Sequence, residues 1–379
     1  MVRLCHCVVS VLIIAAFGAN GVAQGSADVA EVLIGYFGPD SPTHPQAGDM
    51  WCAASLAIEE ANKAGGYEGL PFRLVTGWSG DPWGSGVAAV ARMVYDQKVW
   101  AIVGGIDGPS THLAEQVVAK ARLVLMNPVA SDKSINMANV PWMFSCVPLD
   151  DVQAEVVAEA VAGRLGREPF VIVSAVDHDS HVFTVELLKA LKELELAPAF
   201  HFECGPSDPE SRGALDRVAS IDPAALVLVT DAPGSAAALT QLRERGYEGV
   251  VFGGPWMGQR AFIGKAGKAG GGVMFPYLRA VSAKTRAFED RFSERFGKRP
   301  DYLAAHTYDA VNLVIAAIRK GGLDRARIAD AVREIVPWSG VSGSISWNAV
   351  GANLRRPQLG TIADGAVQAV GEPNRSEDH

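Results

Sequence analysis

Clusters of basic residues and long apolar runs are both missing from this sequence of 379 residues. The formal net charge is −8, and Lys and Arg are dispersed along the chain. A nucleic-acid-binding surface needs a basic stripe that neutralises phosphates, so that class of function is excluded. Beyond residue 23, no segment has the roughly 20 consecutive apolar residues of a membrane-spanning helix. Hydrophobic residues still make up 49% of the chain, enough for one large or two medium-sized packed domains.

Cysteine is scarce, and its spacing matches no metal site. Cys5 and Cys7 lie in the first 23 residues, which leaves Cys52, Cys146 and Cys204 in the rest of the chain. These three allow one intramolecular disulfide or three free thiols, and the sequence leaves both possibilities open. No CxxC pair and no Cys/His spacing indicates zinc. We therefore expect no metal ion and no cofactor.

The common catalytic motifs are absent as well. The chain contains no GxSxG, no HExxH and no GxGxxG after a strand, and the glycine-rich run 265–272 lacks the spacing of a Walker loop. Asp107 and Asp231 could act as an acid and a base across a cleft, but nothing supplies a nucleophile or a metal. We predict that the protein is not an enzyme.

The first 23 residues have the pattern of a signal peptide. Arg3 gives a short positive region, residues 8–17 form an apolar core, and Gly21-Val22-Ala23 supplies small residues for cleavage. We expect export with cleavage near Ala23. At the other end, residues 371–379 are polar and are predicted to be a disordered tail.

Strand and helix patterns alternate along the remaining chain. Two such series, separated by a Pro-containing segment at 141–151, predict an α/β fold of two lobes, each a parallel sheet flanked by helices. Three amphipathic helices near the end would crowd the second lobe, which favours their return to the first. The expected strands are 32–35, 72–75, 101–103, 123–126, 170–175, 199–203, 224–230 and 249–253; the expected helices are 50–64, 84–97, 110–121, 152–165, 183–194, 235–245, 285–296, 304–320 and 324–335.

Two turns follow neighbouring strands of the first series, where an open α/β sheet holds its ligand. The first turn runs from Gly104 to Thr111 and opens a helix, whose free N–H groups and positive dipole end suit an anion. Gly108 allows close approach of a backbone. The second turn, 127–131, ends in Ser131. These turns are predicted to form half of a small-molecule site.

The order and spacing of short motifs over about 320 residues resemble the type I periplasmic binding proteins of ABC importers, in the leucine/isoleucine/valine-binding branch. The resemblance implies two lobes joined by three crossover segments, which close on a small ligand. The motifs are Ile34-Gly35-Tyr36-Phe37-Gly38-Pro39, Gly48-Asp49-Met50, Ala57-Ile58-Glu59-Glu60-Ala61-Asn62-Lys63-Ala64-Gly65-Gly66, Asp81-Pro82, Ile102-Val103-Gly104-Gly105, Asn127-Pro128, Val147-Pro148-Leu149-Asp150-Asp151 and Tyr308-Asp309-Ala310-Val311.

The resemblance also implies where the lobes begin and end. Lobe one would comprise 30–148 plus 278–336, and lobe two 149–277 plus 337–370. As a family member, the protein would be a periplasmic monomer that delivers its ligand to a membrane permease, with no nucleic-acid partner.

In lobe one, family members bind the ligand's carboxylate with hydroxyls and backbone N–H groups of the two turns. The family's hydroxyl is missing at Gly108, so Ser110 and Thr111 would supply it, unless they only cap the helix. Ser131 matches the hydroxyl that contacts the amino-acid head group, unless it only bonds its own turn. Asp107 departs from the family, and it either caps the helix or indicates a cationic or hydroxyl-bearing ligand.

In lobe two, His181 falls where the family often has a tyrosine that stacks on the ligand; a solvated loop and a metal site are the alternatives there. Asp231, at a strand end, either pairs with an ammonium group or caps the next helix. The family's amino-acid binders have an acidic residue near Trp256 that holds the α-ammonium. The indole of Trp256 could make only a cation–π contact with that group, and it favours an apolar or aromatic ligand body. Tyr277, on the second crossover, either lines the cleft or packs in the hinge.

These observations predict an extracytoplasmic solute-binding receptor of an ABC importer. It would capture a small amino-acid-like or small organic ligand by hinge closure between the lobes. The alternative is a ligand-sensing binding protein of the same fold, for example a sensor of amides or aromatic acids. Trp256, together with Ala47 in place of an aromatic residue, argues against branched-chain amino acids.

Overall fold

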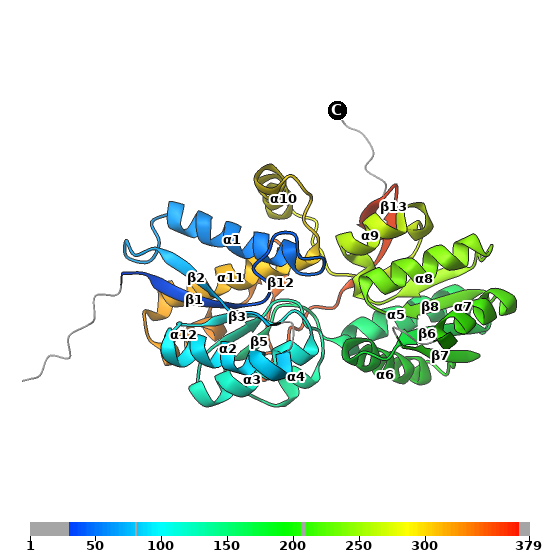
Figure 1. The fold of residues 1–379 in the computed structure, drawn as a ribbon, viewed down its shortest axis with the longest axis horizontal. Helices are drawn as coiled ribbons and strands as arrows, with labels where there is room; N and C mark the ends of the chain where they lie inside the picture. Colours follow the sequence, from blue (N-terminus) through cyan, green and yellow to red (C-terminus); the bar gives the residue numbers. More distant parts are fainter. Residues whose placement is uncertain (1–29, 80–81, 206–208, 371–379) are drawn as a thin grey trace, which may run out of the picture.

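The computed structural model describes residues 30–79, 82–205 and 209–370. The predicted signal peptide 1–23 and the predicted disordered tail 371–379 lie outside the described residues. In the described part, the chain forms two large sheets with helices on both faces of each, in two lobes that lie side by side (Figure 1). The predicted two-lobed α/β fold is confirmed. No helix in these ranges is long and apolar enough to cross a membrane.

The first lobe is built on a parallel sheet with the strand order β2-β1-β3-β4-β5. Successive residues of a strand point to opposite faces. Ile102 packs with residues of α2 and α3, whereas Val103 packs with residues of α1 and α11. The elements are β1 (Val32–Phe37), α1 (Gly48–Lys63), β2 (Phe72–Thr76), α2 (Val87–Ala91), β3 (Ile102–Gly104), α3 (Gly108–Ala121), β4 (Leu125–Asn127), α4 (Ser134–Met137) and β5 (Met143–Ser145).

The second lobe is built on a sheet with the strand order β14-β13-β10-β9-β8-β6-β7. Its strand β8 (Ala225–Val229) is completely buried, because strands pair with both of its edges and helices cover both faces. The other elements are α5 (Asp150–Leu165), β6 (Phe170–Ala175), α6 (His178–Glu193), β7 (Phe200–Cys204), α7 (Pro209–Ile221), α8 (Ala232–Glu244), β9 (Val250–Gly253), α9 (Arg260–Ala266), β10 (Met274–Tyr277), β13 (Gln358–Ala363) and β14 (Ala366–Ala369).

The chain passes between the lobes after β5, again after β10, and a third time before β13, in agreement with three crossover segments. Between the second and third passages, helices return to the first lobe and pack beside α1. This returning part contains α10 (Ala283–Phe296), α11 (Tyr302–Gly321), α12 (Arg325–Glu334), β11 (Trp338–Ser339) and β12 (Ser344–Ile345).

The third passage lies later than the predicted boundary at 336/337. Val341 and Ile345, around the β11–β12 hairpin, are buried in the core of the first lobe. The buried carboxylate of Asp309 on α11 accepts hydrogen bonds from the backbone N–H groups of Val341 (2.9 Å) and Ser342 (2.7 Å). Residues 338–347 therefore belong with the first lobe, although the sequence placed 337–370 in the second.

Three further differences concern elements without a strong apolar pattern. Helix α7 was not predicted, and few of its described side chains are buried. The segment expected to be the second crossover is strand β10, which pairs with β9 and β13. The β13–β14 hairpin was also missed, although Asp364-Gly365, both at positive φ, is a typical two-residue hairpin turn.

Cys52 and Cys146 are buried free thiols. No disulfide joins these two cysteines, which answers part of the question that the sequence left open.

Candidate functional site

The turn after β3 begins helix α3 with a capping box. The carboxylate of Asp107 accepts a hydrogen bond from the backbone N–H of Ser110 at 2.8 Å, and the Ser110 hydroxyl oxygen accepts from the N–H of Ile106 at 3.0 Å. The Thr111 hydroxyl donates to the Asp107 carbonyl at 2.7 Å. Ser110 and Thr111 are fully buried in this network. Their structure thus matches the capping alternative, and their hydroxyls serve the helix end.

The N-terminus of α3 is occupied by a carboxyl group from the other lobe. The backbone N–H of Gly108 donates to Oδ1 of Asp179 on α6 at 3.0 Å. A Cβ at position 108 would lie 2.6 Å from that oxygen, so this close approach requires glycine. Burial, with Asp107 nearby, raises the pKa of Asp179 to about 7. A protein carboxyl group thus occupies the helix end at which the sequence predicted a ligand anion.

The turn after β4 brings Ser131 to the boundary between the lobes. Asn127 shapes the turn, because its side-chain oxygen accepts hydrogen bonds from the N–H groups of Val129 and Ala130 at 3.1 and 2.9 Å. Burial raises the pKa of Asp150 well above its usual value, although a hydrogen bond from the Ser131 side chain acts in the opposite direction. Ser131 therefore contacts a buried carboxyl group and also faces a pocket.

In the second lobe, the strand ends supply Asp231 and Trp256. Asp231 caps α8 by accepting a hydrogen bond from the N–H of Gly234 at 2.7 Å, and its side chain is exposed to the cleft. Trp256 lies in the short turn after β9 and packs edge-on against Phe183 at 5.4 Å between ring centroids. Beside it, the Gln259 amide donates to the Tyr302 hydroxyl of the first lobe at 3.1 Å.

These residues line two adjoining cavities between the lobes. A small enclosed pocket of about 30 Å³ is bounded by Ser131, Gln153, Asp179, Trp256, Gln259 and Tyr302, among others. A larger cleft of about 740 Å³ shares Asp179, Trp256 and Gln259 with that pocket. The acidic residues around the larger cleft are Asp107, Asp177, Asp179 and Asp231, and the basic residue in its lining is Lys265, so the cleft is acidic.

One buried hydrogen-bond acceptor on the wall of the enclosed pocket has no donor among the described residues. The side-chain amide of Gln153 donates to the Pro148 carbonyl at 2.6 Å, which leaves its Oε1 buried with no partner among the described residues. A buried acceptor without a donor is costly, so the pocket is best satisfied by a ligand that donates a hydrogen bond to Gln153.

Of the predicted site residues, Asp107, Ser131, Asp231 and Trp256 line these cavities, and Gly108 contacts Asp179, which lines both. His181 is exposed on α6 and Tyr277 is buried in β10, and neither is among the residues that line the two cavities. The sequence analysis missed Gln153, Asp179 and Gln259. Asp179 lies in the polar stretch 177–181, which was expected to be a loop and belongs mostly to α6, and it could have been chosen from that stretch, whereas no sequence signal marks the two glutamines.

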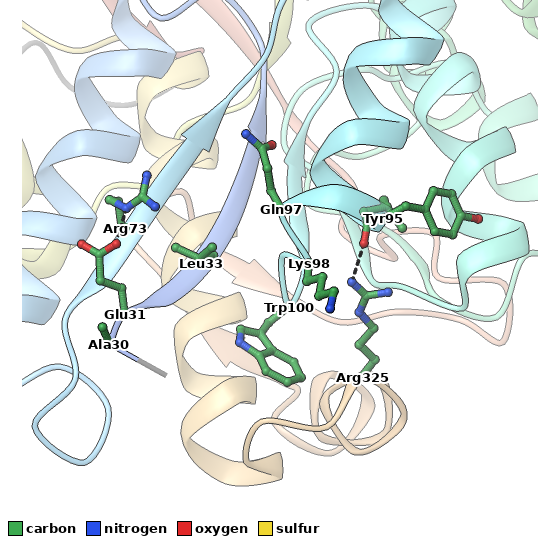
Figure 2. Close-up of a pocket in the computed structure, with 10 residues that line it drawn as sticks. Ala30, Glu31, Leu33, Arg73, Tyr95, Gln97, Lys98, Trp100 and Arg325 are labelled. Atoms are coloured by element: carbon green, nitrogen blue, oxygen red, sulfur yellow. Dashed lines mark hydrogen bonds and ion pairs between the residues drawn. The ribbon is translucent and has the colours of Figure 1, made fainter. Parts of the chain in front are cut away.

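A separate hollow of about 660 Å³ lies on the first lobe (Figure 2). It shares no lining residue with the two interlobe cavities. Its lining includes Trp100, Tyr95 and Arg325. The guanidinium of Arg325 donates to the carbonyls of Val94 and Val99 at 2.9 and 2.8 Å. Because only one lobe builds it, this hollow is not a site that closure of the lobes could enclose.

Comparison with known proteins agrees with the fold. The model of a family described as periplasmic binding protein matches residues 31–358. A curated "Amino acid binding protein" of Pseudomonas aeruginosa is 27% identical over 165 residues, which are 43% of this chain and 43% of that relative. The aligned part thus spans less than half of the relative.

Solved structures of low sequence identity share the whole architecture. The branched-chain amino acid transporter substrate-binding protein LivJ of Streptococcus pneumoniae, in complex with isoleucine, has a TM-score of 0.81 at 23% identity, covering 89% of this chain and 98% of that one. A solute-binding protein of R. palustris in complex with benzoate has a TM-score of 0.79 at 16% identity, covering 90% and 96%. The family match over most of the described residues shows that this chain belongs to the periplasmic binding proteins, with the two-lobed type I fold that its sequence resembles.

Proposed function

We propose that this protein is the solute-binding receptor of an ABC importer and that its ligand is a small amine or amino-acid-like molecule with an apolar or aromatic body. The observation that carries the proposal is the acidic cleft between the lobes, with Trp256 on its wall. Asp107, Asp179 and Asp231 suit an ammonium group. The indole of Trp256 suits an apolar body and also attracts a cation over its face.

The ligand's charge follows from the position of Asp179. While Asp179 accepts the Gly108 N–H, a ligand carboxylate has no access to that donor. An ammonium group is compatible with Asp179, and it supplies the donor that the Gln153 side-chain oxygen lacks. A simple carboxylic acid, which is an anion at neutral pH, has neither a positive charge to place beside Asp179 nor a hydrogen-bond donor for the pocket.

Capture would proceed by hinge closure about the three crossover segments. The solute first contacts the turns of lobe one, and lobe two then closes over it, which shifts the population toward the closed form. A membrane permease would recognise that closed form. Export through a signal peptide cleaved near Ala23 places the mature, monomeric protein in the periplasm, which fractionation and N-terminal sequencing would test.

A thermal-shift screen followed by calorimetry tests the ligand class. We expect aromatic amines and aromatic amino acids to raise the melting temperature, and amine-free acids such as benzoate to leave it unchanged. Trp256→Ala should weaken binding of the best solute by at least about tenfold, since it removes roughly 1.5–3 kcal/mol of aromatic contact. Tyr95→Ala, in the separate hollow on lobe one, is the matched aromatic control and should bind normally.

Two results would count against the proposal. A strong response to amine-free acids alone would overturn the ammonium assignment. If leucine or valine bound most tightly, the role given to Trp256 would be wrong.

A further inference from the structure

A cluster of metal-ligating side chains lies at the rim of the cleft, where the two lobes meet. His112 comes from α3, and Asp132 follows the turn after β4, so both belong to the first lobe. His178 is the first residue of α6 in the second lobe. Oδ2 of Asp132 lies 3.0 Å from Nε2 of His112 and 2.8 Å from Nε2 of His178, and the three ligand atoms all lie within 4.8 Å of one another.

Neighbouring groups hold these side chains in place. The second oxygen of Asp132 accepts hydrogen bonds from the backbone N–H and the hydroxyl of Ser134, at 2.8 and 2.7 Å. The other ring nitrogen of His112, Nδ1, lies 3.5 Å from a carboxylate oxygen of Glu115, which is itself buried. A carboxylate that orients the outer nitrogen of a histidine is the usual support of a histidine ligand to a metal.

The donor set selects the kind of metal. Two imidazole nitrogens and one carboxylate oxygen suit zinc and its first-row neighbours, whereas magnesium and calcium prefer oxygen ligands alone. Tetrahedral zinc, with bonds of about 2.0–2.2 Å, separates its ligand atoms by roughly 3.3 Å, which small side-chain rotations would reach here. Asp132 is fully buried, while the His178 side chain is 43% exposed, which gives an ion access from solvent.

We propose that His112, Asp132 and His178 form a binding site for a divalent cation of the zinc class that links the two lobes. A water molecule would complete the tetrahedron, since three protein ligands leave one position open. From the sequence we predicted no metal ion, because residues 177–181 match no established metal motif by spacing. The fold changes that expectation, since it adds two ligands from the first lobe.

The site has a thermodynamic consequence, because its ligands come from both lobes. An ion that binds all three residues binds the closed arrangement more tightly than any arrangement in which the lobes are apart. It therefore shifts the population toward closure, and the ion and the transported solute raise each other's affinity by the same factor.

Calorimetric titration with zinc chloride alone tests the site, at pH 8 on chelator-treated protein without a histidine tag. We expect one equivalent of zinc to bind, and His112→Ala and His178→Ala each to weaken that binding at least about tenfold. His181→Ala is the matched control, because His181 is an exposed histidine on the same helix outside the cluster. Visible absorption of the cobalt-loaded protein gives a second readout, with tetrahedral bands that His178→Ala abolishes.

The outcomes separate this proposal from the proposed function. Absence of zinc binding, or equal affinities for the His178→Ala and His181→Ala proteins, would overturn the metal site. Melting temperatures of the variants verify that each has folded. Since the titration uses no solute, its failure leaves the receptor proposal unaffected, and a failed solute screen leaves the metal site unaffected.

Discussion

His306 is a histidine held in its neutral form inside helix α11. Its side chain is fully buried; Nδ1 donates to the carbonyl of Tyr302 at 3.0 Å, and Nε2 has no partner among the described residues. Burial, helped by the charge of Arg355, lowers the pKa of His306 to about 3. Because this pKa lies below the usual value of about 6.5, the imidazole takes up a proton at a higher pH in the unfolded chain than in the folded protein. The neutral imidazole therefore contributes fully to the free energy of unfolding above pH 6.5, and this contribution falls as the pH drops toward 3.

We predict that acid destabilises the wild-type protein more than the His306→Leu variant. Between pH 7 and pH 5, a group with these pKa values removes about 2 kcal/mol from the free energy of unfolding. Urea denaturation of both proteins at the two pH values measures the difference. Parallel losses of stability in the two proteins would mean that His306 is not the acid-sensitive group.

At the same scale, the residue types in the sequence were enough to predict the part of the candidate site that lies at the start of α3. Asp107 and Gly108 could be chosen because a helix start after a strand needs a capping residue and allows a close approach. The group that approaches Gly108 could not be predicted, since Asp179 lies 71 residues away in the chain and belongs to the other lobe. Hydroxyls at 110 and 111 suggested ligand contacts, but a helix cap uses the same residues in the same positions.

At the scale of elements, Asp309 fastens the β11–β12 hairpin to α11. Besides the two backbone N–H groups, its buried carboxylate accepts the hydroxyl of Ser342 at 2.6 Å. Burial raises the pKa of Asp309, and the hydrogen bonds from Ser342 and Val341 act in the opposite direction. One side chain thus satisfies a turn that would otherwise bury unpaired donors.

The Asp309→Ala variant should lose about 3 kcal/mol of unfolding free energy, because the N–H groups of Val341 and Ser342 become buried without partners. Chemical denaturation gives the value. Asp324→Ala is the control, since Asp324 caps α12 by a single hydrogen bond from the N–H of Arg327, and this loss should cost only about 1 kcal/mol. Equal losses in the two variants would contradict the anchoring role.

The parallel strands were predictable because a strand that is buried on both faces is an apolar run, as in β8. The position of the β11–β12 hairpin was not predictable, because residues 338–347 are rich in glycine and serine and have no periodic pattern of apolar residues. What places it is Asp309, at a separation of 32 residues from Val341. The chain order of the lobes could therefore be predicted from pattern, and the end of the first lobe could not.

At the scale of the whole molecule, polar contacts join the lobes at two places, between α1 and α9 and at the rim of α3 and α6. These two pairs of helices lie in the upper and lower parts of the view in Figure 1. On the rim of α3 and α6, the cluster around Asp132 is joined by an ion pair from Lys133 to Glu186 at 2.5 Å. On the opposite side, Arg260 of α9 forms a bidentate pair with Asp49 of α1, with N–O distances of 2.9 and 2.8 Å. These contacts join side chains of different lobes, so the proposed hinge motion would break and re-form them.

The Arg260→Ala variant should favour the open arrangement. The Arg260 side chain is 49% exposed, so solvent screens the pair and its contribution is about 1 kcal/mol, which shifts the ratio of closed to open molecules about fivefold. Asp49 keeps Lys298 at 2.7 Å, so no carboxylate is left buried and unpaired, and the melting temperature should change little. Small-angle scattering without solute should show a larger radius of gyration, and the affinity for solute should fall by up to the same factor.

The control is Arg245→Ala, which breaks a 2.8 Å pair with Asp216 inside the second lobe and should change neither the radius of gyration nor the affinity. If both variants gave the wild-type radius and affinity, the Arg260–Asp49 pair would have no part in closure.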